Sequence, residues 1–110
     1  MKKKSDTLQG SLDLLVLKVI ASQPGLHGYG IMTRIKVLSE EVLQVEEGSL
    51  YPALHRMEEA GLLRAKWVVN TNGRRTRGYR LTASGKKQLA AKTERWKQVT
   101  AAVDQVLRAT

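Results

Sequence analysis

The spacing of apolar residues changes abruptly at one point of this chain, directly after Gly61. Before Gly61, apolar residues recur every three or four positions, which is typical of helices that bury one face. After it, Leu63, Ala65 and Trp67 alternate with basic residues, which is typical of a half-buried strand. The chain is therefore expected to fold as a set of helices followed by β-structure.

Three helices are predicted before Gly61, at residues 8–22, 29–38 and within "EGSLYPALHRMEEAGLL", residues 47–63. In the third, Leu50, Leu54 and Met57 form one apolar stripe. Ser49 is expected to cap the helix, with Pro52 in the first turn, and Gly61 to end it as the C′ residue. The first six residues, "MKKKSD", are expected to be disordered.

A β-hairpin and a long final helix are predicted after Gly61. Asn72-Gly73 is a turn signal between two alternating runs, and it places arginines at or beside the hairpin tip. Trp67 is expected on the inward side of this hairpin, in the core. From residue 83 to about residue 109 the final helix carries apolar or small residues in steps of four and three, which is typical of a coiled-coil seam; these are Leu89, Thr93, Trp96, Thr100, Val103 and Leu107.

The seam predicts dimerisation, because the helix is too long for the small domain before it to cover. The alternative is a helix that folds back on its own domain. We expect a DNA-binding domain over residues 1–82 and a dimerisation helix over residues 83–110. Near the middle of the seam, Trp96 and Val99 could pack tightly against the second copy, or could leave a slot that binds flat aromatic compounds.

The excess positive charge of the chain lies in one segment. The net charge is +9, and between Glu59 and Glu94 there are nine basic residues and no acidic one. The remainder is balanced, so the excess charge favours a polyanion partner. The chain has no Cys, no apolar run of membrane-spanning length and no secretory signal, and we expect a cytoplasmic protein.

Together these elements predict a mainly α fold with a β-hairpin (α+β), a winged helix-turn-helix. In that design the third helix enters the major groove and the hairpin follows the DNA backbone or the adjacent minor groove. Arg56 is expected to reach a base edge, and Arg74, Arg75 and Arg77 to neutralise phosphates. The polar face of the third helix adds Ser49, Pro52 and His55. Tyr51, at the edge of that face, either bonds a phosphate or packs inward.

Three stretches also carry a family resemblance: "LDLLVLKVIASQPGLHGYGI", "EGSLYPALHRMEEAGLL" and "GRRTRGYRLTASGKKQL". They resemble the PadR family of bacterial transcriptional regulators and cover most of the chain from Leu12 to Leu89. The resemblance implies a homodimeric winged-helix repressor that is released, in many members, by a small aromatic or hydrophobic molecule. It carries the DNA-contacting roles onto Ser49, Tyr51, Pro52, His55, Arg56 and residues 74–77. The single C-terminal helix is shorter than the helical domain of many relatives, which puts a dedicated effector pocket in doubt.

Two other classes of protein fit the composition less well. An enzyme is not expected, because His27 and His55 are the only histidines and no phosphate loop, metal-ligand cluster or nucleophile with an oriented base occurs. No catalytic residue, metal or cofactor is therefore predicted. A small basic RNA- or ribosome-binding protein remains the alternative, although few aromatic residues are available to stack on bases.

Overall fold

The computed structural model describes residues 3–69 and 71–110, which form four helices and one two-stranded antiparallel sheet. This is the predicted α+β fold. The elements are α1 (Lys3–Ser22), α2 (Gly28–Leu38), α3 (Glu47–Glu59), β1 (Leu63–Val69), β2 (Arg75–Leu81) and α4 (Ala83–Arg108). Below, α3 is called the recognition helix, and β1 and β2 with their connecting loop are called the wing.

The first helix begins earlier than the sequence predicted. Residues 3–6 are already helical, so the expectation of disorder is wrong for them, and the first two residues lie outside the described part of the chain. Lysine is a good helix former, and extending an existing helix needs no new nucleus. The helix can therefore continue toward the N-terminus without an apolar stripe.

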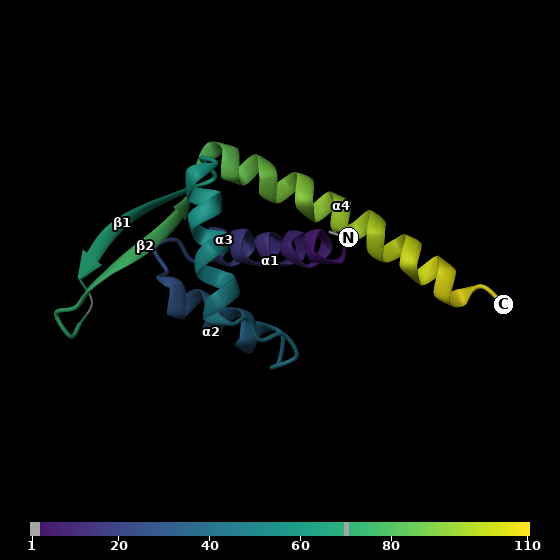
Figure 1. Ribbon diagram of the computed structural model, residues 1–110, viewed down its shortest axis with the longest axis horizontal. Helices are drawn as coiled ribbons and strands as arrows, with labels where there is room; N and C mark the ends of the chain where they lie inside the picture. The colour runs from purple at the N-terminus through teal and green to yellow at the C-terminus, as the bar shows by residue number, and fades with distance from the viewer. Residues whose placement is uncertain (1–2, 70) are drawn as a thin grey trace.

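The core forms where α1 meets the other elements. Val16, Leu17 and Ile20 of α1 are fully buried against Ile31 of α2 and Leu50 of the recognition helix. In Figure 1, α1 runs through the centre, the recognition helix crosses in front of it and the wing extends to the left. The helical stripe predicted from Leu50, Leu54 and Met57 is buried, and it is what holds the recognition helix in place.

The recognition helix ends as predicted but begins differently. Gly61 has φ of +79°, Gly61 N donates to Glu58 O at 3.0 Å, and Leu62 N donates to Met57 O at 2.9 Å, which is a Schellman motif. The predicted N-cap is wrong, because Glu46 occupies that position and makes no side-chain cap bond.

Pro52 consequently lies one turn deeper than expected. It is the sixth residue of the helix, and because it has no N–H, the carbonyl of Gly48 receives no helical hydrogen bond from it.

The wing extends beyond the core. Its register runs from Leu63 opposite Leu81 to Val69 opposite Arg75. In β1, Leu63 at the base is buried, whereas the residues from Lys66 onward are exposed. Trp67 is 58% exposed, so its predicted place in the core is wrong. It lies four residues beyond Leu63, about 13 Å along the strand, in the exposed part of β1.

The final helix starts on the domain and then leaves it. Thr82 Oγ1 caps α4 by accepting from Gly85 N at 3.0 Å, and Leu89 packs against the core. The helix lies against α1, and its C-terminal part projects past the rest of the protein (Figure 1), where residues 101–110 are all exposed. Within the described residues, no helix has both the length and the apolar character needed to cross a membrane.

Candidate nucleic-acid interface

The recognition helix presents a polar face to solvent. Its buried side is Leu50, Ala53, Leu54 and Met57. At about 100° per residue, the opposite side consists of Pro52, His55 and Glu59, and all three are exposed. The described residues therefore leave the centre of this face open to solvent, as an element that enters a groove requires.

Two further pairs of residues flank this face. Ser49 and Arg56 lie toward α1, and Tyr51 and Glu58 lie toward the wing. Ser49 is exposed, while Arg56 and Glu58 are partly buried. The predicted site residues therefore lie on one side of the recognition helix, but some of them are next to α1 and others are next to the wing.

The centre of the face can both donate and accept hydrogen bonds. His55 Nε2 lies 3.6 Å from Glu59 Oε2, and the two side chains are 73% and 75% exposed. Exposed pairs of this kind contribute little to stability, so they are easily rearranged by a ligand. Base edges in the major groove offer matching acceptors and the cytosine amino donor.

Arg56 is held by α1. Its Nη1 donates to Asp13 Oδ2 at 2.8 Å and its Nη2 to Asp13 Oδ1 at 3.1 Å, in a two-bond fork. The hydrogen bonds to Asp13 raise the pKa of Arg56 above its ordinary value, although burial opposes them. The Arg56 side chain is 42% exposed and that of Asp13 only 10%. A base contact by Arg56 stays a prediction, and in the free protein both terminal nitrogens are engaged.

Arg77 is held by the recognition helix. It lies within β2 opposite Trp67, away from the hairpin tip where the sequence placed it, and its Nη2 donates to Glu58 Oε2 at 2.8 Å. Its Nε is buried without a hydrogen-bond partner among the described residues. The guanidinium is therefore partly buried, and the Arg77 side chain as a whole is 40% exposed.

Arg74 and Arg75 lie nearer the tip. Both are exposed, Arg74 just before β2 and Arg75 as its first residue, and the turn between the strands contains Gly73 with φ of +79°. The Arg75 guanidinium lies 4.7 Å from the centre of the Trp67 ring. Cation–π stacking of this kind holds an exposed arginine in one direction.

Tyr51 packs against α2 and is also partly exposed, and its contact with a phosphate stays a prediction. Its side chain is 44% exposed, yet its ring packs so closely on α2 that a Cβ added at Gly28 would lie 2.6 Å from it. Beside it, between α2 and β2, is a cavity of about 480 Å³ that Tyr79 also lines. Burial raises the pKa of Tyr79, which the nearby charge of Arg77 opposes.

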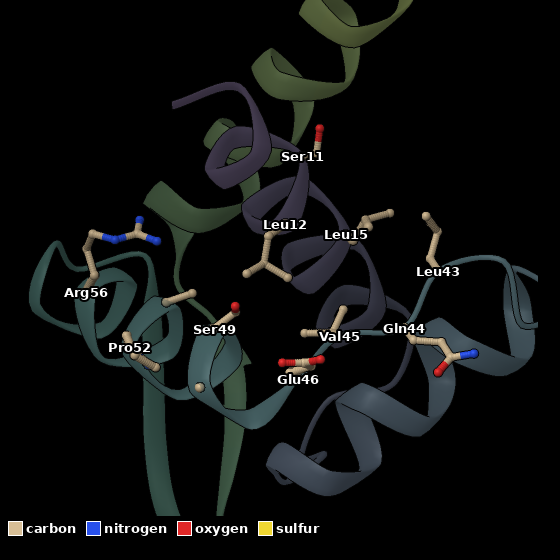
Figure 2. A pocket seen from close by; sticks show the side chains of 12 residues that line it. Ser11, Leu12, Leu15, Leu43, Gln44, Val45, Glu46, Ser49, Pro52 and Arg56 are labelled. Atoms are coloured by element: carbon tan, nitrogen blue, oxygen red, sulfur yellow. The ribbon is translucent and has the colours of Figure 1, made fainter. Parts of the chain in front are cut away.

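A larger cavity lies on the other flank of the recognition helix. It measures about 620 Å³ and separates α1 from the recognition helix and the connector before it. Figure 2 shows Leu12 and Val45 pointing into it, with Arg56 at its edge. This cavity was not predicted from the sequence, because the connector is mostly polar. Leu43 and Val45, two apolar residues in that connector, were the signal that could have indicated it.

The carboxylates that hold the arginines were also missed. Asp13 is buried in α1 and Glu58 lies late in the recognition helix, and each binds an arginine far away in the sequence. An acidic residue between apolar neighbours, as Asp13 is between Leu12 and Leu14, was a signal for such a pair. Buried carboxylates normally have partners.

The predicted seam of α4 divides into a covered and an open part. Leu89, Thr93 and Thr100 are partly buried, whereas Trp96 is 45%, Val103 49% and Leu107 76% exposed. Val99 is 36% exposed beside them. The open part is an apolar strip with no cover from the described residues of its own chain.

Three packed helices, a third helix with an open polar face and an arginine-bearing hairpin beside it define a winged helix-turn-helix DNA-binding protein. The sequence profile of the transcriptional regulator PadR-like family matches residues 16–91, well over half of the chain. The chain belongs to this family of DNA-binding transcriptional regulators.

Solved structures of similar proteins have the same fold. A PadR-like transcription factor from Bacteroides fragilis is 28% identical, with a TM-score of 0.78 over 96% of this chain and 99% of that one. A Streptococcus mutans protein is 29% identical, with a TM-score of 0.81 over 92% and 90%. A PadR family transcriptional regulator from Eggerthella lenta is 27% identical, with a TM-score of 0.75 over 99% and 93%.

Proposed function

We propose that this protein is a homodimeric repressor that binds an inverted repeat in DNA and acts in the cytoplasm. The observation that carries the proposal is the open polar face of the recognition helix beside exposed arginines of the wing. Ser49, Tyr51, Pro52 and His55 supply the surface that meets the major groove. A protein bound through that face would hinder transcription when the repeat overlaps a promoter.

The wing supplies the phosphate contacts. Arg74 and Arg75 are exposed beside its tip, and charge on a phosphate backbone attracts them without regard to sequence. The sequence also assigned DNA contacts to Arg56 and Arg77. In the free protein these two arginines are paired with Asp13 and Glu58.

The dimer is proposed to form through α4. Its open strip of Trp96, Val99, Val103, Val106 and Leu107 is the kind of surface that a second copy of the same helix covers. The predicted seam also includes Leu89, Thr93 and Thr100, which are partly buried in the single chain. Two copies related by a two-fold axis would present two recognition helices to the two halves of an inverted repeat.

A small aromatic or hydrophobic effector is part of the proposal. Trp96 and Val99 lie half-way along α4 and are 45% and 36% exposed in the single chain. Opposed to their copies in a dimer, they would form an aromatic slot of the kind that flat apolar compounds enter.

The test of DNA binding is selection from a pool of random duplexes, followed by affinity measurements at one salt concentration. We expect a selected duplex with an inverted repeat that binds at least about a thousandfold more tightly than random duplex. Structured RNA is the control, because the exposed Trp67 stacked by Arg75 could also serve an RNA-binding protein. Equal or tighter binding to that RNA would replace the repressor with the alternative.

A further inference from the structure

We infer that Arg56 and Arg77 position the recognition helix and do not themselves touch DNA. This inference rests on the proposed function, because it concerns how the helix is held for binding a duplex. Two of the four arginines that the sequence assigned to DNA thereby become positioning residues. Arg74 and Arg75 remain as the proposed contacts.

The two ion pairs lie on opposite flanks of the helix. Arg56 bonds to Asp13 of α1, and Glu58 bonds to Arg77 of the wing. Two residues turn an α-helix by about 200°, so the two attachments are about 160° apart around its axis. Attachments on opposite sides resist rotation of the helix in either direction, and the face of Pro52, His55 and Glu59 stays pointed outward.

The pair with α1 is the more buried one. Asp13 is 7% exposed and is the buried charged residue among those described, and both its oxygens accept from Arg56. A base contact that replaced these two bonds would leave this carboxylate buried without its partner, which strongly opposes such a move. The helix α4, through which the dimer is proposed to form, also lies against α1. The Asp13–Arg56 pair therefore links the recognition helix to the same helix, α1, that supports α4.

The pair with the wing sets the spacing between the two DNA-binding elements. The Glu58–Arg77 bond is 2.8 Å long, and the Arg77 guanidinium also lies 5.8 Å from the centre of the Trp67 ring. The carboxylate and the indole thus hold Arg77 on the face of the wing that looks toward the recognition helix. A backbone phosphate outside the wing is reached more directly from Arg74 and Arg75, which are exposed beside the tip.

The first test exchanges the charges of the wing pair. Glu58→Arg and Arg77→Glu are made singly and together, and affinity is measured for the duplex selected by the wild-type protein. We expect each single variant to lose about tenfold or more and the double variant, whose net charge is unchanged, to return to within about threefold of wild type. Arg80→Glu, at an exposed position of the same strand, measures the effect of charge reversal alone.

A double variant as weak as Arg77→Glu would overturn the role of Arg77, because a glutamate that must meet a phosphate cannot be rescued by its neighbour. If the wild-type protein selects no duplex, the proposed function and this inference both fail. Failure of the rescue with normal selection by the wild type refutes the inference alone.

The second test is a double-mutant cycle of Asp13→Asn and Arg56→Met. The amide replaces one accepting oxygen and so removes one of the two hydrogen bonds. We expect both single variants to lose affinity, the double variant to lose little more than the worse single, and the slope of log K against log salt to stay at the wild-type value. Thermal unfolding identifies the temperature range in which all variants are folded.

Direct binding of Arg56 to DNA predicts a different pattern. Asp13→Asn would keep wild-type affinity because it frees Arg56, so that of the two single variants only Arg56→Met would weaken binding. Removal of a bond to a phosphate would also flatten the salt slope by about 0.9. Either of these results would overturn the positioning role of Arg56.

Discussion

At the scale of single residues, basic side chains that are close in sequence have different surroundings. Arg75 and Arg77 are two positions apart and share a face of β2, yet the first is exposed and the second is bonded to Glu58. The distance of each residue from the wing tip decides this difference. Substitutions in this run should therefore have unequal effects.

Arg74→Ala and Arg75→Ala test the proposed phosphate contacts. Each should weaken selected and random duplexes alike and flatten the dependence of log K on log salt by about 0.9 for each phosphate that is no longer neutralised. Fluorescence anisotropy of labelled duplexes over a salt series measures both effects. A changed sequence preference with an unchanged slope would contradict the assignment.

Tyr79 predicts an alkaline limit to stability. Burial raises its pKa above the ordinary value of about 10, so the folded state holds the phenol proton more tightly than the unfolded state. This contribution is complete below the pKa of the unfolded state and is lost as pH rises through the folded pKa. Denaturant unfolding between pH 8 and pH 11 should show the loss.

The matched variant is Tyr79→Phe, which keeps the ring but has no proton to lose. Its stability should fall less steeply over the alkaline range than that of the wild type. Parallel curves for the two proteins would assign the alkaline loss to other groups.

At the scale of elements, α4 serves two surfaces at once. Leu89 packs on the core of its own domain, whereas Val103 and Leu107 are 49% and 76% exposed. Burial of apolar area stabilises by about 25 cal/mol per Å², so an open strip of this kind favours association. The apolar stripes of α2 and the recognition helix, by contrast, are buried in the core with α1.

Deleting the residues after Lys92 should separate these two roles. The truncated chain keeps Leu89 and should stay folded, but it should sediment as a monomer. Its affinity for the selected duplex should fall at least about a hundredfold, because a monomer binds one half-site without help from a second. A truncated protein that still sediments as a dimer would rule out the α4 interface.

At the scale of the whole molecule, the chain is 59 Å long and 29 Å wide because α4 projects from the domain. In the proposed dimer, the two recognition helices must match half-sites about 34 to 36 Å apart. An effector shifts DNA binding only by preferring one arrangement of the two domains. A small change in the angle between the paired helices would change that spacing.

Planar aromatic compounds test whether Trp96 senses such a ligand. They should quench the tryptophan fluorescence of the wild type and of Trp67→Phe, and should weaken binding to the selected duplex in both. Trp67 is a suitable control because it lies on the wing beside Arg75. Quenching that persists unchanged in Trp96→Ala would leave Trp96 as dimer packing only.

The amino-acid sequence by itself determined the elements and their order. The stripe of Leu50, Leu54 and Met57, the stop at Gly61 and the alternation after Leu63 all depend on residues within a few positions of each other. Backbone geometry makes such short-range patterns readable, because helix and strand periods and positive φ are properties of neighbouring residues. The start of the recognition helix was misplaced because both Glu46 and Ser49 could precede it.

Only the tertiary structure decided which side chains meet. Asp13 and Arg56 are 43 positions apart, and the cavity beside them is lined by two distant stretches, residues 11–15 and 43–56. Trp67 fits the alternation of a core strand, but its burial depends on how the other elements pack on that stretch of the sheet, and it is left 58% exposed. Pairing and exposure follow from how whole elements pack, and no local pattern carries that information.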